Sequence, residues 1–371
     1  TKISSNIRNT FQGKIIGITG SCGKTSLKEL LSNSLNKFGK ASSSPKSYNN
    51  KYGVPLSLFN LNIKNSYGIF EIGMDKKGEI DFLSGIVKPD IGVITNISYA
   101  HAKNFDNILD IAKAKSEIIN NIKKSGFIIL NSDDKFFTFH KKIALKKKIN
   151  IISFGYSYKS DIKFLNIKKF KNYFRIKVKI FNQIKTFNIK FKYVNYIKNI
   201  LSTLAVLSAL DKIEDLKSNF FKGVTIPDGR GNISKIKFKE KKIFLIDESY
   251  NSNPLSLLSA ISNFSNSDVQ NNRKHFLMGD MLELGKHSKR LHKNMSTIIN
   301  NSKISKIHIF GKDVSETYRG IQKNRRGRIL RNETDIFNLI VKDLNNNDYL
   351  MIKGSNSTGL NRIVETLRGN I

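Results

Sequence analysis

The sequence predicts an α/β protein with two domains, each built around a mostly parallel β-sheet. A chain of 371 residues is long enough for two domains of roughly 150 residues each. Short runs rich in β-branched residues alternate with helix-like stretches through residues 1–150, the pattern of a parallel sheet covered by helices. The turn-rich segment Pro227-Asp228-Gly229-Arg230-Gly231 separates this part from a second alternating series. We therefore predict one domain over residues 1–231 and another over 232–371.

Five apolar, strand-sized runs and three helix-like stretches fill the first 150 residues. The predicted strands are 14–19, 67–72, 91–96, 126–131 and 149–154. The predicted helices are 26–38, 109–121 and 135–145. Strand and helix alternate along this part of the chain, which favours parallel strands joined by helical crossovers.

The spacing of the apolar residues changes after residue 160. Between residues 160 and 192, lysines alternate with Ile, Phe and Val, the period-two pattern of half-exposed antiparallel strands. An apolar helix is predicted at 195–210. The second α/β series has predicted strands at 242–247, 275–279, 306–310 and 348–353, and the sequence shows no internal repeat.

The formal net charge of +35 is of the kind that nucleic-acid-binding proteins show. The lysines, however, are spread along the whole chain, Ile and Asn are abundant, and Trp is absent, which is typical of a coding bias toward A and T. The densest basic run, 141–148, has apolar residues in its middle and is typical of a helix with a solvated lysine face. We therefore expect no nucleic-acid partner.

Composition also bears on cellular location. The apolar runs are strand-sized and fall well short of the roughly 18 residues of a membrane span. The opening residues lack the apolar core and cleavage site of a secretory signal. The single cysteine, Cys22, excludes internal disulfides and cysteine-based zinc sites and fits a reducing compartment. We expect a cytoplasmic monomer without a membrane span.

The segment Thr19-Gly20-Ser21-Cys22-Gly23-Lys24-Thr25-Ser26 has the order strand, glycine-rich turn, helix that a phosphate loop requires. Glycines let the backbone approach phosphates, and the helix N-terminus supplies partial positive charge. Lys24 would neutralise phosphate oxygens of ATP, and Thr25 would hold Mg²⁺. The spacing departs from the general G-x-x-x-x-G-K-[ST] pattern and reduces to TGxxGKT, and Cys22 has no partner base that would make it a nucleophile.

Two further polar residues follow predicted strands. Glu71 ends the second predicted strand, and His101 follows the third. Ligands of open parallel sheets bind at the carboxyl ends of the strands, so we expect both residues to face the same crevice as the phosphate loop. Mg²⁺ takes a carboxylate, phosphate oxygens and waters, which suits Glu71. His101 suggests a second metal position or a contact with the transferred phosphate.

These residues together resemble the Mur ligase family. The resemblance rests on 18–26, on the Glu71 strand, on Thr95-Asn96 with His101, and on Ala112-Lys113-Ala114-Lys115-Ser116-Glu117-Ile118. Four more segments resemble the branch that adds D-alanyl-D-alanine: 48–55, 247–254, 279–285 and 353–355. The resemblance implies a P-loop-type central ATPase domain with a mostly parallel sheet, followed by a Rossmann-like α/β C-terminal domain.

The resemblance also implies roles for individual residues. Lys24, Glu71, His101 and Lys115 would be catalytic, with Thr25, Glu71, His101 and a carbamylated Lys115 holding two Mg²⁺ ions. Residues 20–26 (Gly20, Ser21, Cys22, Gly23, Lys24, Thr25, Ser26), Asn199, Arg230 and Asp247 would bind ATP. The substrates would meet Asn49, Asn50, Asn96, Asn251 and Asn253.

Two departures from the family pattern stand out. The adenine segment of the family has a histidine before its asparagine, whereas this chain has Lys198-Asn199. The family also carries an N-terminal domain that grips the UDP end of the substrate, and only about a dozen residues precede the first predicted strand here. We expect that grip to be missing from this chain.

The implied reaction is ATP-dependent amide formation between D-alanyl-D-alanine and UDP-N-acetylmuramoyl-tripeptide in peptidoglycan precursor synthesis. The tripeptide carboxylate would become an acyl phosphate, which the dipeptide amine then attacks. Three alternatives stay open: a folylpolyglutamate-type or polyglutamate-forming ligase of the same superfamily, a basic nucleotide-regulated binding module, and an inactive remnant. The third residue of the accepted peptide, lysine or diaminopimelate, has no signature in the sequence.

Overall fold

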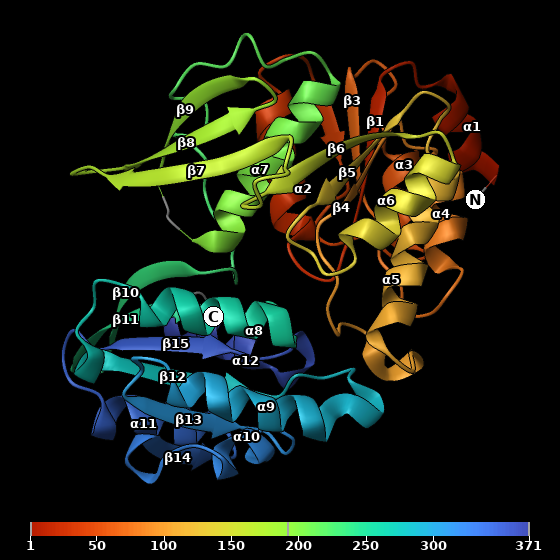
Figure 1. Ribbon diagram of the computed structural model, residues 1–371. Coiled ribbons are helices and arrows are strands. Elements are labelled where there is room, and N and C mark those ends of the chain that lie inside the picture. The colour runs from red at the N-terminus through yellow and green to blue at the C-terminus, as the bar shows by residue number, and fades with distance from the viewer. Residues whose placement is uncertain (1, 191–192, 370–371) are drawn as a thin grey trace. The chain divides into compact units, whose positions relative to one another are not determined.

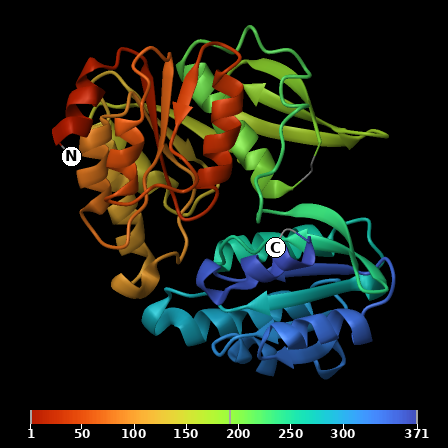
Figure 2. The ribbon, with the colours of Figure 1, turned by 180° about the vertical axis from the view of Figure 1, so that it is seen from behind.

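The computed structural model describes residues 2–190 and 193–369. Its chain forms two compact units, one of Thr1–Ser98 with Asn104–Thr225 and the other of Tyr99–Lys103 with Ile226–Ile371. Figures 1 and 2 show each unit as a sheet with helices packed against it. The predicted α/β class is confirmed for both units, while the predicted boundary after residue 231 stays a prediction.

The first unit contains a sheet in the order β2-β3-β1-β4-β5-β6-β7-β8-β9. The parallel part runs from β2 to β7, and the pairs β7–β8 and β8–β9 are antiparallel, as predicted for the lysine-rich region. Residues 191–192, at the end of that predicted region, lie outside the described residues. The strands are β1 (Lys14–Thr19), β2 (Ala41–Ser43), β3 (Tyr67–Glu71), β4 (Ile91–Ile94), β5 (Phe127–Asn131), β6 (Asn150–Gly155), β7 (Ile162–Lys169), β8 (Phe174–Ile180) and β9 (Gln183–Ile189).

Helices cover this sheet in two groups. The apolar side chains of α2 and α7 share one buried cluster with Ile16, Ile18 and Ile69 of the central strands. The helices α3, α4, α5 and α6 gather apart from that pair in Figure 1. The helices of this unit are α1 (Lys2–Thr10), α2 (Lys24–Leu35), α3 (Gly53–Phe59), α4 (Glu79–Val87), α5 (Ile108–Ser116), α6 (Phe137–Lys146) and α7 (Val194–Ala209).

The central strand β1 sets the position of the phosphate-loop segment. All its residues after Lys14 are buried, because β1 has parallel partners on both sides, β3 and β4. Strand β4 ends at Ile94, earlier than the predicted 91–96, and helix α2 begins at Lys24, earlier than the predicted 26. The carboxyl ends of β1, β3 and β4 therefore lie side by side at one sheet edge.

The second unit contains a sheet in the order β10-β11-β15-β12-β13-β14, parallel except for the β10–β11 hairpin. On one face α11 and α12 share a buried cluster with Leu245, Leu277 and Leu350, and α8, α9 and α10 form the remaining helical layer. The elements are β10 (Asn232–Phe238), β11 (Lys241–Asp247), α8 (Pro254–Ser265), β12 (Lys274–Gly279), α9 (Ser288–Asn300), β13 (Lys306–Phe310), α10 (Ser315–Arg319), β14 (Arg326–Leu330), α11 (Glu333–Asp343), β15 (Tyr349–Lys353) and α12 (Leu360–Leu367). This is the predicted Rossmann-like arrangement.

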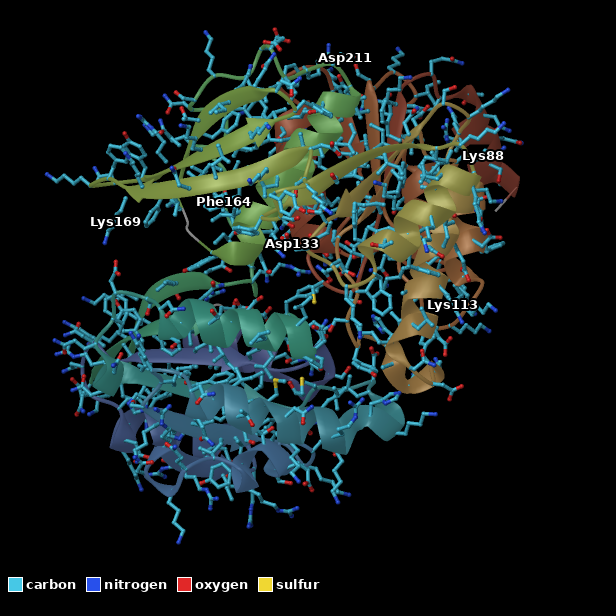
Figure 3. All side chains as sticks on the ribbon, in the orientation of Figure 1. Lys88, Lys113, Asp133, Phe164, Lys169 and Asp211 are labelled. Carbon is cyan, nitrogen blue, oxygen red and sulfur yellow. The ribbon has the colours of Figure 1, made fainter. Side chains whose placement is uncertain are left out.

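The lysines are spread over the surface, as their distribution in the sequence predicted. Lys169 on the β7 strand and Lys113 on α5, both labelled in Figure 3, lie on different elements, and blue nitrogen tips project from both units. In the described part of the chain, no helix is long and apolar enough to cross a membrane.

Two buried histidines stack on neighbouring strands of the second sheet. The rings of His275 and His308 lie 5.6 Å apart, and His275 Nδ1 is 3.3 Å from His308 Nε2. The Arg328 N–H donates to His308 Nδ1 over 3.0 Å, so Nε2 carries the ring proton that His275 accepts. Burial, and then the neighbouring His275, lower the pKa of His308 from 6.5 to about 3. Burial also lowers the pKa of His275.

We expect this pair to make the protein sensitive to acid. Unfolded histidine takes up a proton near its ordinary pKa of about 6.5, whereas folded His308 does so only near 3. The free energy of unfolding should therefore fall as the pH drops below 6.5, by up to about 1.4 kcal/mol per pH unit for such a group. The free energy of unfolding, measured by urea unfolding at several pH values, should depend less steeply on pH in His308→Asn than in the wild type. Equal slopes would contradict the expectation.

Candidate functional site

The backbone between β1 and α2 has a shape that depends on two glycines. Gly20 has φ +144°, and a Cβ atom there would lie 1.9 Å from Thr95 Oγ1. Gly23 has φ +82° and is the N-cap of α2. Side chains rarely adopt such φ values, so the loop needs glycine at both positions.

Side chains from the loop after β4 fix this backbone. Asn96 Oδ1 accepts from the Cys22 N–H over 2.9 Å, and Asn96 Nδ2 donates to the Cys22 carbonyl over 3.1 Å. Thr95 Oγ1 also donates to that carbonyl over 2.6 Å. The Ser21 hydroxyl donates to the Ser98 carbonyl and accepts from the Ser98 N–H. Asn96, expected to meet the substrate, thus holds the phosphate-loop segment in this structure.

The first turn of α2 is arranged to receive an anion. The N-cap residue is Gly23, which has no side chain to cap the helix, so the first N–H groups of α2 stay available to a ligand. Lys24 Nζ donates to the Gly20 carbonyl over 2.9 Å, which folds the side chain back over the loop. Ser26, half-buried, follows on the same turn. Phosphate oxygens would meet a lysine and several backbone donors here.

Thr25 and Glu71, each predicted as a Mg²⁺ ligand, form a hydrogen-bonded hydroxyl–carboxylate pair. Thr25 Oγ1 donates to Glu71 Oε2 over 2.8 Å, and Asn49 Nδ2 donates to Glu71 Oε1 over 2.7 Å. Ser47 Oγ lies 3.2 Å from Thr25 Oγ1, and the Glu71 N–H donates to Ser44 Oγ over 3.0 Å. The Glu71 side chain is 2% exposed.

This pair suits Mg²⁺ that arrives with phosphates. A hydroxyl and one carboxylate are hard oxygen ligands, and Mg²⁺ in nucleotide sites takes one or two carboxylates together with phosphate oxygens and waters. Within residues 2–190 and 193–369, no group of three His, Cys, Asp or Glu side chains is placed to hold a metal. A dedicated protein cage is therefore not part of the described structure.

Lys115 lies buried on α5, only 2% exposed. Its burial, and then the positive charge of Lys24, lower the pKa of the Lys115 amine well below its ordinary value. A neutral amine is the form that reacts with carbon dioxide to give a carbamate. The neighbouring Lys113, labelled in Figure 3, is exposed and bonds to Asp110 on the same helix.

His101 lies in the loop that follows β4 in the chain. Strand β4 ends at Ile94, and the segment Tyr99–Lys103 belongs to the second compact unit. There His101 Nδ1 lies 2.6 Å from Glu283 Oε2, and the Lys103 N–H donates to the Glu283 carbonyl over 2.9 Å. The hydrogen bond with His101 lowers the pKa of the Glu283 carboxyl. An Nδ1–H held by a carboxylate leaves the lone pair on Nε2, the arrangement typical of histidine metal ligands.

Asn199 and Asn50 occupy different surroundings in the first unit. Asn199, on α7, is buried, and its Oδ1 lies 3.4 Å from the position of a Cβ on Gly23, so it is close to the phosphate-loop segment. Lys198, where the family has histidine, forms an ion pair with Asp133 over 3.2 Å. Asn50 Oδ1 accepts from the N–H groups of Tyr52 and Gly53 and so starts helix α3.

The residues predicted in the second unit lie at the carboxyl end of β11 and in the adjoining loops. Asp247 Oδ2 is 3.1 Å from Arg368 Nη2, and its Oδ1 accepts from the N–H and hydroxyl of Ser249. The Arg230 guanidinium lies 4.2 Å from the centre of the Tyr250 ring. Asn253 caps α8 with a capping box, and the Asn251 carbonyl accepts from Lys353 Nζ over 2.9 Å.

Sequence reasoning missed the polar residues that surround the Thr25–Glu71 pair. Ser44, Ser47 and the buried Lys28 all take part, through the bonds above and through Lys28 Nζ, which donates to the Ser44 carbonyl over 2.6 Å. The run Ser42-Ser43-Ser44-Pro45-Lys46-Ser47 just before Tyr48 was the available signal, since a polar turn after a short strand at this sheet edge brings hydroxyls to the site.

Comparisons with known proteins agree with this geometry. The Mur ligase middle domain matches residues 18–207, and the Mur ligase glutamate ligase domain matches residues 235–356. A UDP-N-acetylmuramoyl-tripeptide–D-alanyl-D-alanine ligase of Buchnera aphidicola is 34% identical over 99% of this chain and 79% of its own length. The chain belongs to the Mur ligase family. The TGxxGKT spacing that departs from the general phosphate loop is thus the spacing of a Mur ligase.

Other Mur ligases extend the match. The ligase of the same name from Rickettsia prowazekii is 29% identical over 96% of this chain and 79% of its own length. A crystal structure of MurF from Acinetobacter baumannii superposes with a TM-score of 0.88 at 26% identity, covering 99% of this chain and 79% of that one. MurF from Thermotoga maritima in complex with ADP, at 21% identity, has the same fold with a TM-score of 0.85 and covers 100% of this chain and 83% of that one. The chain is an ATP-dependent ligase of the ADP-forming type, as the resemblance implied.

Proposed function

We propose that this chain joins D-alanyl-D-alanine to UDP-N-acetylmuramoyl-tripeptide during peptidoglycan precursor synthesis. The observation that carries the proposal is the match over nearly the whole chain to relatives named for this reaction. The segments 247–254 and 279–285 support it, because they resemble this branch of the family rather than its polyglutamate-forming members. The enzyme would act in the cytoplasm as a monomer, with its two domains meeting in the chain near residue 231.

The chemistry begins with a carboxylate that cannot react with an amine as it stands, since its oxygen is a poor leaving group. The terminal carboxylate of the tripeptide attacks the γ-phosphorus of ATP, and the bond to the β-phosphate oxygen breaks, giving an acyl phosphate and ADP. The free amine of D-alanyl-D-alanine then attacks the acyl carbon. Inorganic phosphate leaves, the amine loses a proton, and an amide remains. Positioning supplies most of the rate gain, as two reactants held in line reach effective molarities of about 10⁵ M or more.

The phosphate-loop segment and its neighbours serve the first step. Lys24 and the N–H groups of α2 bind the phosphates and spread the charge of the transferring group. Thr25 and Glu71 would hold the first Mg²⁺, and His101 with a carbamylated Lys115 would hold a second. When bound, Mg²⁺ would neutralise negative charge on the phosphate oxygens and so stabilise the charge that develops there in the transition state.

The remaining predicted residues take substrate roles in this proposal. Asn199 lies beside the phosphate-loop segment, where it would meet adenine. Arg230 and Asp247 would reach the phosphates and ribose after exchanging their present partners Tyr250 and Arg368. Asn49 and Asn50 would meet the nucleotide sugar, and Asn251 and Asn253 the amine substrate.

An ADP-release assay tests the proposal directly. We expect release to require both D-alanyl-D-alanine and UDP-N-acetylmuramoyl-tripeptide, with the tripeptide offered in its lysine and its diaminopimelate form. Release that needs neither substrate would overturn the proposal. Release that depends on glutamate would favour a polyglutamate-forming ligase instead, and release that depends on polynucleotide would favour the basic binding module.

A further inference from the structure

Lys28 lies one helical turn after Lys24 on α2, on the face that also carries Thr25. Its side chain is fully buried, at 0% exposure. Nζ donates to the Ser44 carbonyl over 2.6 Å and to the Lys46 carbonyl, and lies 3.2 Å from Glu29 Oε1. An ammonium has three N–H donors, so these three oxygens match its full hydrogen-bonding capacity.

The segment that Lys28 holds has no regular structure of its own. Residues 44–49 form the first part of the connection from β2, which ends at Ser43, to α3, which begins at Gly53. Lys46 in its middle has φ +46°, a left-handed conformation that L residues seldom adopt. A buried carbonyl in such a segment needs a donor from elsewhere, and the donor for Ser44 is Lys28.

The same segment supplies polar side chains to the Thr25–Glu71 pair. Ser44 Oγ accepts from the Glu71 N–H, and Asn49 Nδ2 donates to Glu71 Oε1. Ser47 Oγ lies 3.2 Å from Thr25 Oγ1. The Asn49 carbonyl also accepts from the Gly73 N–H just beyond β3, over 2.7 Å. Segment 44–49 thus holds in place the Thr25 hydroxyl and the Glu71 carboxylate, the two groups proposed to bind Mg²⁺.

We infer that Lys28 is a positioning residue for the metal and phosphate site. It acts through segment 44–49, since its Nζ donates to the Ser44 and Lys46 carbonyls of that segment. Removing it would leave the buried Ser44 carbonyl without its donor, and the serine and asparagine side chains would lose their fixed positions. The inference rests on the proposed function, because it takes Thr25 and Glu71 as the metal ligands.

Lys274 provides a matched control in the other unit. It is also a buried lysine, 1% exposed, and its Nζ donates to the carbonyls of Ser265 and Ser267 over 2.8 and 3.3 Å. Replacing it by methionine removes the same kind of interaction from the second unit instead of the first. A general loss of stability would therefore appear in both variants.

The test measures metal-dependent nucleotide binding by thermal unfolding of the full chain. Wild type, Lys28→Met and Lys274→Met are each unfolded with ADP plus a series of Mg²⁺ concentrations, and with ADP plus EDTA. Loss of a group that orients metal ligands typically weakens metal binding about 10- to 100-fold. We expect Lys28→Met to need about tenfold or more Mg²⁺ for half of the ADP-dependent rise in Tm, while Lys274→Met matches the wild type. Lys28→Arg should recover part of the loss, since it restores cationic N–H donors.

Each outcome separates the two ideas. A wild type whose Tm with ADP does not respond to Mg²⁺ would refute the proposed metal site itself. If the wild type responds normally and Lys28→Met has an unchanged Mg²⁺ requirement, the role of Lys28 is overturned. The same holds if the Mg²⁺ requirement of Lys274→Met increases as much as that of Lys28→Met. If Lys28→Met does not fold, Lys28→Gln takes its place with the same expectation, because its amide keeps two N–H donors but has a shorter reach.

Discussion

Lys24→Ala should abolish ADP formation, with kcat at least about 10³-fold below the wild type. The lysine stands at the first position of α2, and its Nζ already lies over the phosphate-loop segment at Gly20. Its charge matters most when negative charge spreads over the transferring phosphoryl group, so its loss raises the barrier more than it weakens ground-state binding. Coupled-enzyme detection of ADP with both substrates present measures the effect.

The control for Lys24 is Lys40→Ala, which removes an exposed lysine from the turn after α2. That variant should keep the wild-type rate, since it changes the net charge by the same amount without touching the loop. Circular dichroism should show that both variants are folded. Full turnover by Lys24→Ala would refute the assignment of residues 19–26 as the phosphate loop.

Lys115→Ala should lower kcat/KM by about 100-fold, the upper end of what loss of a metal-supporting group costs. The buried Lys115 amine, with its pKa lowered by burial, can attack carbon dioxide, forming an N–C bond and losing a proton to give a carbamate. Alanine removes that carboxylate and leaves space for a small one. We expect added acetate or formate to restore part of the activity, measured as ADP release.

Lys113→Ala is the matched variant for Lys115, two positions away on the same helix but with an exposed side chain. It should behave as the wild type and should not respond to acetate. Wild-type enzyme stripped of bicarbonate should lose activity and regain it when bicarbonate returns. Unchanged activity at low bicarbonate would count against carbamylation.

Much of the fold could be predicted because the parallel strands are short, apolar and bounded by turns. Strand β1 matches its predicted bounds, and β5, β6 and β12 lie within one residue of theirs. Strands β2, β10 and β14 were missed. Ala41–Ser43 has only three residues, Asn232–Phe238 is half-exposed and lysine-rich, and Arg326–Leu330 has apolar residues only at its end. Edge strands have one partner instead of two, so less of their surface needs to be apolar.

The sequence predicted those site residues whose positions follow from the order of strands, turns and helices along the chain. A glycine-rich turn between strand and helix, and a glutamate at the end of a parallel strand, meet at one sheet edge by topology alone, which placed Thr25 beside Glu71. The pairing of His101 with Glu283 joins residues far apart in the sequence, so no local spacing indicates it. The sequence gives no sign that Lys28 differs from the other basic residues, because the chain has 64 lysines and arginines and most of them follow the pattern of surface residues.

The segment Tyr99–Lys103 has a consequence for dividing this protein into fragments. The chain leaves the first unit after Ser98, returns at Asn104, and leaves again after Thr225, so three covalent connections join the units. Expressing residues 226–371 alone would remove His101, which pairs with the Glu283 side chain, and Lys103, whose N–H donates to the Glu283 carbonyl. If the chain were cut after residue 225, the two fragments would have to associate to restore these contacts, because the segment Tyr99–Lys103 is part of the first fragment but belongs to the second unit.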